Sequence, residues 1–310
     1  MPRSTTVIQP ARGRSPARSA AVAAAPAVFV VLWSTGFVGA KYGLPYAGPF
    51  TFLALRLAIA GALLGIAAVL SGDRLSRSQI KRAAVSGLLL HATYLGGVFW
   101  AISRGTPAGV AAVVVSLQPV LVAALAARLL GERLVRRQWL GLVLGVAGVA
   151  LVIAPGLAGR SGQLPAAGVV ACLLALVGGT AGTVWQKRHG DGIPLMAGTS
   201  VQYAAAATAL FVAALAAESR HVVWTARFVG ALVWLVVALS IGAVLLLLAL
   251  LRRGSASGVS SLFYLVPPVT AIETFLVFGE RLAAISVAGI AVTAVGVALA
   301  VVPGVSSRSR

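Results

Sequence analysis

Long runs of apolar residues alternate with short polar segments along the whole chain. Ten of these runs reach or approach the ~20 residues that a helix needs to cross about 30 Å of hydrocarbon. They cover roughly residues 24–42, 49–70, 82–103, 107–129, 137–154, 165–186, 194–217, 228–251, 257–278 and 283–303. The segments between them are rich in glycine, proline and charge, and none is long enough for a soluble domain. The pattern predicts an all-α integral membrane protein of ten transmembrane helices.

Composition supports a membrane protein and argues against a nucleic-acid-binding one. The chain is 59% hydrophobic and only 10% charged, whereas soluble domains carry about 25% charged residues. Its net charge is +19, but nucleic-acid binding requires basic residues gathered on one face with aromatic residues between them. Here the basic residues stand in short groups between apolar runs, so the expected partner is the lipid bilayer. A single cysteine, Cys172, excludes an intrachain disulfide and is expected to be a small core residue.

The distribution of basic residues indicates how the helices cross the membrane. If the N-terminus is inside, the inner segments hold 18 lysines and arginines and the outer segments hold six, with one more inside a span. Cytoplasmic loops are enriched in basic residues, so we expect both termini in the cytoplasm of a bacterial inner-membrane protein. Residues 1–23 are expected to be a disordered cytoplasmic tail, with an organelle transit peptide as the alternative. A second short tail covers 305–310.

The chain contains an internal repeat. Residues 119–156 align without a gap onto 267–304, with identity at 13 of 38 positions. The shared positions include the Gly-Glu-Arg-Leu run at 131–134 and 279–282. Just upstream, Arg-Gly-Thr-Pro-Ala-Gly-Val at 104–110 parallels Arg-Gly-Ser-Ala-Ser-Gly-Val at 253–259.

The repeat predicts two units of five helices each, at 24–156 and 165–304. An odd number of helices per unit means that the two copies cross the membrane in opposite directions. Inverted repeats around a site near the bilayer midplane are typical of secondary transporters, in which one unit rocks against the other. A static scaffold has no evident need of such symmetry.

These residues resemble the EamA domain family of the drug/metabolite transporter superfamily. The resemblance rests on the tandem blocks at 105–151 and 254–299, and on Lys41 followed by Pro49 and Arg56 in the first half. It implies ten helices around a central cavity, and export or uptake of small metabolites. The second half has Gln202 at about the place of Arg56, so a role for Arg56 would not be duplicated.

Ionisable groups inside the spans are candidates for substrate binding or coupling, because burying one at a helix centre costs roughly 2.5–3.5 kcal/mol on insertion scales. Arg56 and Glu273 are expected at similar depth in the outer half of the membrane. They could meet and bind a zwitterionic or charged substrate, or Glu273 could exchange a proton. The alternative is a fixed ion pair that only locks helices. Leu125 stands at the position equivalent to Glu273, which favours a functional role.

His91 lies near the middle of the third span, and Tyr94 lies three residues on and therefore on the same helix face. Histidine is the side chain that changes charge near physiological pH, so His91 is a candidate proton carrier. A histidine hydrogen-bonded between helices is the alternative. Tyr94 suits either a pocket wall or a packing pair.

Prolines are expected to kink two spans. Pro119 and the pair Pro267-Pro268 lie inside the fourth and ninth runs, and carbonyls freed at membrane depth are tolerated where they line a cavity. Gln118 and Tyr264 flank these breaks and are candidate substrate contacts.

Two further features carry both a functional and a structural interpretation. Trp33, in the first span, could supply an aromatic wall, or could face lipid or pack. The repeated motif of Gly131 and Glu132, and of Gly279 and Glu280, is interpreted as the end of one helix and the start of the next, with the glutamate favourable at a helix N-terminus.

Catalytic and ATP-binding motifs are missing from the sequence, so we expect neither an enzyme nor a cofactor or metal. The leading hypothesis is a secondary transporter that exports amino acids, related amines or drugs by alternating access, as a monomer or homodimer. Its expected partner is a small-molecule substrate, and a proton or another ion is the candidate coupling ion. Uptake and nucleotide-sugar exchange remain open within transport. The alternative from another class is a non-transporting membrane scaffold or partner subunit.

Overall fold

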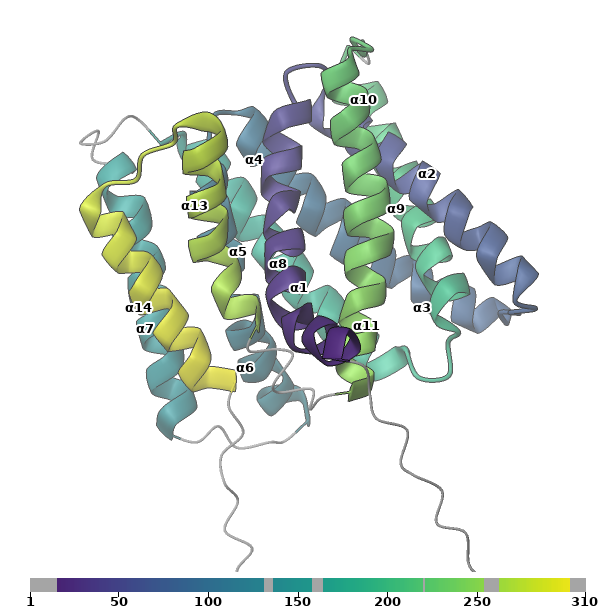
Figure 1. Ribbon diagram of the computed structural model, residues 1–310, viewed down its shortest axis with the longest axis horizontal. Helices are drawn as coiled ribbons and strands as arrows, with labels where there is room; N and C mark the ends of the chain where they lie inside the picture. The colour runs from purple at the N-terminus through teal and green to yellow at the C-terminus, as the bar shows by residue number, and fades with distance from the viewer. Residues whose placement is uncertain (1–15, 131–135, 158–163, 220, 254–261, 302–310) are drawn as a thin grey trace, which may run out of the picture.

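The computed structural model describes residues 16–130, 136–157, 164–219, 221–253 and 262–301. Within these ranges the chain forms a bundle of ten helical segments, several of them broken into shorter elements. The start of α1 (Pro16–Gly43) and the end of α14 (Ala284–Val301) lie at the same end of this bundle (Figure 1). That arrangement agrees with an even number of crossings.

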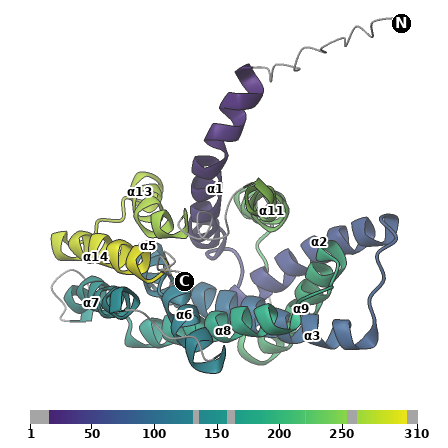
Figure 2. The same ribbon diagram turned by 90° about the horizontal axis from the view of Figure 1, so that it is seen from below.

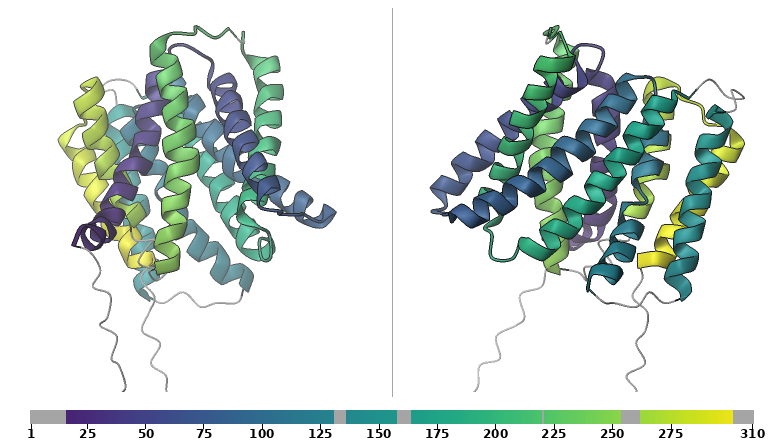
Figure 3. Two further views of the ribbon diagram at one scale, coloured as in Figure 1. Left: turned by 45° about the vertical axis from the view of Figure 1, so that its right-hand side comes forward. Right: turned by 180° about the vertical axis from the view of Figure 1, so that it is seen from behind.

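The first five segments follow the predicted runs closely. After α1 they are α2 (Pro49–Leu70), the continuous stretch of α3 (Arg77–Gly87), η1 (Leu88–Leu95) and α4 (Gly96–Ser103), then α5 (Ala108–Val115) with α6 (Gln118–Leu130), and α7 (Arg136–Leu157). Figure 3 shows the hairpin of α2 and α3 leaning away from the rest of the bundle.

The second five segments repeat this order. They are α8 (Ala166–His189), α9 (Leu195–Ala217), the stretch of α10 (Ala226–Val233), η2 (Trp234–Ala243) and α11 (Val244–Arg253), then η3 (Phe263–Leu265) with α13 (Val266–Phe278), and α14. Seen from below, α7 and α14 form one side of the bundle and α2, α3 and α9 the opposite side (Figure 2).

Length and composition fit a membrane. Among the described residues, eight helices are long and apolar enough to span a bilayer, and two shorter apolar helices cover 263–278 and 284–299. Large hydrophobic side chains such as Ile66, Leu174 and Leu276 are more than half exposed, which suits helix faces that contact lipid. The predicted all-α membrane fold is confirmed.

Two local expectations need correction. α1 begins at Pro16, so residues 16–23 are helical and do not belong to a disordered tail. The prolines also act differently from simple kinks. The fourth span breaks at 116–117 and Pro119 lies in the first turn of α6, while Pro267 and Pro268 lie in the first turn of α13. A proline costs no hydrogen bond there, because the first N–H groups of a helix have no partner within it.

The third helical segment of each half contains a π-helical stretch. η1 and η2 occupy equivalent places when residues 104–110 are aligned with 253–259 and the alignment is continued backwards. π-helical turns are rare and are frequently found at functional sites. Their presence in both halves shows that the repeat extends to this local detail.

Close packing of α7 on α14 also follows the repeat. A Cβ on Gly148 would lie 2.7 Å from the carbonyl oxygen of Gly289, and a Cβ on Gly296 would lie 2.8 Å from that of Gly141. The repeat pairs Gly141 with Gly289 and Gly148 with Gly296, so exchanging the two halves converts one contact into the other. Small residues let helix backbones approach closely in membranes. The two helices therefore cross about the axis that relates the halves.

A carboxylate from the second half caps a helix of the first. Glu218 follows α9 and accepts hydrogen bonds from the backbone N–H groups of Phe50 (2.7 Å) and Thr51 (3.0 Å) and from the Thr51 hydroxyl (2.6 Å). Negative charge is favourable at a helix N-terminus, and Gly48 offers no side chain to cap α2 itself. A backbone bridge between Ala47 and Val222 joins the same two loops.

Candidate functional site

Four polar side chains from four helices meet where the two halves join. Arg56 of α2 is only 5% exposed, and its Nε donates a hydrogen bond to Oγ of Ser240 in η2 (3.1 Å). The hydroxyl of Tyr203 in α9 donates to the carbonyl oxygen of Ser240 (3.4 Å). The ring of His91 in η1 packs edge-on against Tyr203, with centroids 4.8 Å apart. Two of these residues come from each half.

This cluster obeys the symmetry of the repeat. The alignment through 104–110 and 253–259 pairs His91 with Ser240, and Gln202 stands at about the place of Arg56. Arg56 is hydrogen-bonded to Ser240, and Gln202 lies beside His91. Exchanging the halves therefore converts one polar pair into the other. The pairs lie around the same axis as the α7–α14 contact.

Arg56 brings a positive charge to this site without a carboxylate beside it. No acidic side chain among the described residues lies within ion-pair distance of it, and none of those residues is hydrogen-bonded to its two terminal nitrogens. A guanidinium presents a planar fork of donors that matches a carboxylate. The site can therefore accept an anionic group.

The structure does not join Arg56 to Glu273. Glu273 lies on α13, and both of its carboxylate oxygens are buried with no hydrogen-bond partner among the described residues. The alternative of a fixed ion pair between Arg56 and Glu273 does not occur in this conformation, in which the Arg56 side chain is held by Ser240 instead. The two groups are separate features and need separate explanations.

Gln118 and Tyr94 gather at a different place, on α8. The Gln118 amide donates to the carbonyl oxygen of Gly179 (3.1 Å) and to the Thr183 hydroxyl (2.8 Å). A Cβ on Gly179 would lie 2.8 Å from the Tyr94 ring. In this conformation Gln118 ties the broken fourth span to α8, and Tyr94 packs against the same glycine.

Trp33 belongs to an aromatic cluster between α1 and the start of the ninth span. Its ring lies 5.4 Å from Phe29 and 5.2 Å from Phe263, centroid to centroid. Neighbouring Ser34 donates to the carbonyl oxygen of Val266 (3.3 Å). Tyr264 follows Phe263, and its hydroxyl is buried without a partner in the described part of the chain. Trp33 therefore packs between helices here.

The second copy of the repeated Gly-Glu motif ends a helix and adds an ion pair. Gly279 has a positive φ of 68° and caps the end of α13, a conformation that glycine adopts at low cost. Glu280 lies before α14 begins and pairs with Lys41 at the end of α1, rather than serving a helix N-terminus. Lys41 also lies 4.6 Å from the centre of the Phe278 ring. Gly131 and Glu132 lie outside the described residues.

Sequence reasoning missed Ser240, Tyr203, Glu218 and the pairing of Lys41. For Ser240 a signal existed, because the repeat places it opposite His91. For Glu218 the signal was a lone acid directly after an apolar run, together with a helix start that lacks a capping side chain. The remaining contacts join residues far apart in sequence and have no local pattern.

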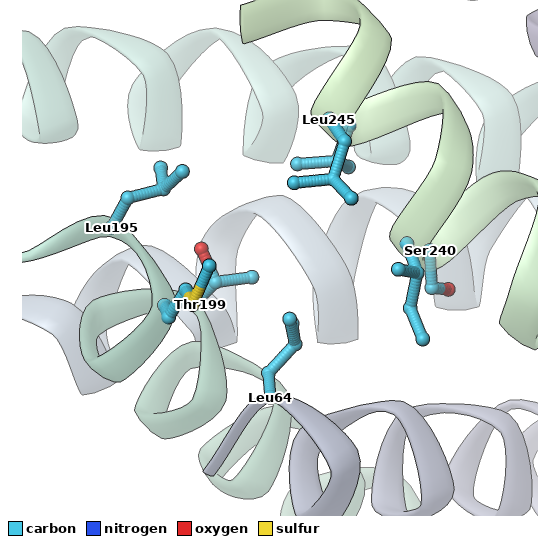
Figure 4. A pocket seen from close by; sticks show the side chains of 8 residues that line it. Leu64, Leu195, Thr199, Ser240 and Leu245 are labelled. Atoms are coloured by element: carbon cyan, nitrogen blue, oxygen red, sulfur yellow. The ribbon is translucent and has the colours of Figure 1, made fainter. Parts of the chain in front are cut away.

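A small cleft opens beside the cluster, between α2, α9 and the second half of the eighth span (Figure 4). Its lining is mainly aliphatic, including Leu64, Leu195 and Leu245, with Thr199 and Ser240 as polar groups. Ser240 thus belongs both to this cleft and to the Arg56 cluster. Elsewhere in the described residues, no group of three histidine, cysteine or acidic side chains gathers as a metal site would require.

Known proteins similar to this chain are membrane transporters. The uncharacterized transporter YvbV of Bacillus subtilis (strain 168) is 28% identical over 265 residues, which cover 85% of this chain and 86% of the relative. A probable terminal-alkyne amino-acid exporter of Streptantibioticus cattleyicolor is 30% identical over 278 residues, covering 87% and 90%. The uncharacterized inner membrane transporter YedA of Escherichia coli (strain K12) is 27% identical and covers 82% of each chain.

The fold is also known from experiment. A crystal structure covers 91% of this chain and 97% of its own, with a TM-score of 0.64 and 21% sequence identity. The EamA-like transporter family matches residues 20–154 and again 166–302, and so accounts for both halves of the repeat. The chain belongs to the EamA-like transporter family, as a multi-pass membrane transporter and not an enzyme.

Proposed function

We propose that this protein is a secondary transporter that exports small amino-acid-like metabolites across a bacterial inner membrane by alternating access. The observation that carries the proposal is Arg56: a buried guanidinium, at the junction of two inverted halves, with no acidic partner among the described residues. The proposal has both termini in the cytoplasm.

A buried charge without a counter-charge is costly in a membrane protein, and such residues mark substrate or ion paths. A substrate carboxylate would supply the missing negative charge and bind the two terminal nitrogens of Arg56. Hydrogen bonds to charged groups contribute about 1.5–3 kcal/mol. One such interaction corresponds to roughly tenfold to a hundredfold in affinity.

The surroundings of Arg56 fit a small substrate with an apolar part. Tyr203 and His91 offer ring surfaces beside the guanidinium, and the cleft at Ser240 is mainly aliphatic. Two relatives are named for amino-acid export, namely the Streptantibioticus exporter and a probable amino-acid metabolite efflux pump of Salmonella typhimurium. These names support the same substrate class and direction for this chain.

The symmetry supports alternating access. The axis that relates the halves passes through both the α7–α14 glycine contact and the polar cluster. A site on this axis can face either side when one half moves against the other. A non-transporting scaffold would need neither the symmetry nor the unpaired arginine.

The test is counterflow in proteoliposomes. Purified protein is loaded with unlabelled alanine, valine, leucine or threonine, and entry of the same labelled amino acid is followed. Saturable entry above that of empty liposomes is expected for at least one of the four. No counterflow with any of them, by protein that is folded in detergent, would contradict the proposed substrate class. Growth of a deletion strain on high concentrations of the four amino acids provides a check in cells.

A further inference from the structure

Glu273 is the one intramembrane acid in the described chain that makes neither a hydrogen bond nor an ion pair there. Both of its oxygens are shut off from solvent. Among the other described acids, Glu218 caps α2, Glu280 binds Lys41, and Asp73 and Asp191 lie in loops. A carboxylate with no partner at membrane depth is strongly disfavoured.

The position of Glu273 on the helix accounts for only part of its burial. Successive residues of a helix are about 100° apart, so Glu273 lies about 60° from Thr270 on one side and about 60° from Leu276 on the other. Thr270 is 0% exposed and Leu276 is 73% exposed. Glu273 therefore lies at the border between the protein-facing and the exposed sides of α13, and its two carboxylate oxygens are nevertheless buried.

The helices packed against α13 bring no free charge to Glu273. They are α1, α5 and α14, with η3 preceding α13. The titratable or charged groups near α13 in these elements and in the residues just after α13 are Lys41, Tyr42, Tyr264, Glu280 and the exposed Arg281. Lys41 and Glu280 bind each other, which leaves Glu273 without a counter-charge in the described region.

We propose that Glu273 is the proton-binding group that couples transport to the proton gradient. It holds a proton while its two oxygens are buried, as they are in this structure, and releases the proton to water when movement of the halves exposes them. The step is the ionisation of one carboxylic acid, with the proton going to water, so one proton is carried for each opening and closing. The inference rests on the proposed transport, for which it names the coupling ion.

Two further observations support this assignment. The Thr270 hydroxyl of α13 and the Tyr264 hydroxyl of η3 are also buried without partners in the described chain, so the ninth span carries further polar groups that would bind water once they are exposed. The repeat places Leu125 at the position of Glu273, so the architecture itself does not require an acid there.

The first experiment needs no substrate. Infrared difference spectra of the purified protein between neutral and alkaline pH report the carbonyl stretch of protonated carboxylic acids. We expect a band that is lost in Glu273→Gln and shifted in Glu273→Asp, and that is kept in the control Asp191→Asn, which changes an exposed loop. A band that survives in Glu273→Gln would overturn the proposal, and so would its absence from the wild type.

The second experiment measures coupling in proteoliposomes, with whichever of the four labelled amino acids shows counterflow. For one proton per substrate, a gradient of one pH unit should drive about tenfold accumulation in the wild type. Glu273→Gln should keep counterflow and lose this accumulation. Accumulation that persists in Glu273→Gln would overturn the proposal. Absence of counterflow from the wild type would instead contradict the proposed function, while the infrared result would still decide the protonation of Glu273.

Discussion

Nε of Arg56 lies 3.1 Å from Oγ of Ser240, although 184 positions separate the two residues in the chain. This hydrogen bond joins a helix of the first half to a helix of the second, inside the membrane. It holds the guanidinium by one nitrogen and leaves the fork of terminal nitrogens for another partner. The arrangement orients an arginine without neutralising it.

Replacing Arg56 tests this arrangement directly. Arg56→Gln removes the charge, and we expect at least a tenfold rise in KM or complete loss of counterflow, because a charge-assisted hydrogen bond contributes about 1.5–3 kcal/mol. Arg56→Lys should recover activity only in part, since an ammonium lacks the planar fork. Ser240→Ala is the matched control that keeps the charge and loses only the tether. Unchanged KM in Arg56→Gln would remove Arg56 from the substrate site.

The glycine contact between α7 and α14 should be intolerant of a side chain. A Cβ on Gly148 would lie 2.5 Å from the backbone nitrogen of Thr293, and forcing extra atoms into packed contacts costs about 1–3 kcal/mol. We expect Gly148→Ala to lower the midpoint of thermal unfolding in detergent. Gly230→Ala is the control, since no atom beyond its chain neighbours and its own helix backbone lies within 4 Å of the added carbon. Equal unfolding midpoints for the two variants would contradict the packing.

Glu218 should stabilise the protein through the N-terminus of α2. Glu218→Ala leaves two backbone N–H groups without their acceptor, and loss of a helix cap costs about 1 kcal/mol. Thr51→Ala removes a single hydrogen bond and should cost less. The measurement is thermal unfolding of both variants in detergent. A Glu218→Ala protein as stable as the wild type would show that the cap contributes nothing.

The ion pair of Lys41 and Glu280 should hold α1 and α13 together at one end of the bundle. Partly exposed ion pairs contribute only about 0.2–1 kcal/mol, so the informative readout is accessibility and not unfolding. In a Cys172→Ala background, Thr270→Cys should be labelled by a water-soluble maleimide several-fold faster once Lys41→Ala is added. The charge exchange Lys41→Glu with Glu280→Lys should restore slow labelling. If the labelling rate is the same in all three proteins, the ion pair does not hold α1 and α13 together.

Orientation in the membrane can be tested with reporter fusions. Arginine and lysine are in excess at the end of the bundle that carries the start of α1 and the end of α14, which predicts that this end faces the cytoplasm. A reporter active only in the cytoplasm should work after Arg310 and in the loop at Asp191, and should fail at Gly105. Activity at Gly105 with silence after Arg310 would reverse the orientation of every helix.

The spans could be predicted from the sequence because a bilayer demands a long apolar run for each crossing. The run predicted at 49–70 matches α2 at both ends, since Pro49 starts the helix and Ser71 follows it. The start of α1 at Pro16 was missed because residues 16–23 are too rich in arginine, serine and alanine to resemble a span, although they form a helix.

The site was predictable only in part. Arg56, His91 and Glu273 were selected as candidates because ionisable residues inside spans are few. Which of them meet depends on how helices cross, and that is not encoded locally. The hypothesis that Arg56 and Glu273 meet was drawn from their similar depth alone, whereas the structure gives Arg56 a neutral partner on another helix. Aligning His91 with Ser240 through the repeat was the one route to that partner.

The pseudo-symmetric crossing of α7 over α14 has a consequence for the transport cycle. The two halves have the same fold but can differ in conformation. If each half adopts the conformation of the other, the protein reaches a second state that is open to the opposite side of the membrane. Such an interchange needs no new contact at the crossing point, where glycine already meets glycine in both arrangements. The crossing of α7 and α14 can therefore keep its contacts while the two halves exchange conformations.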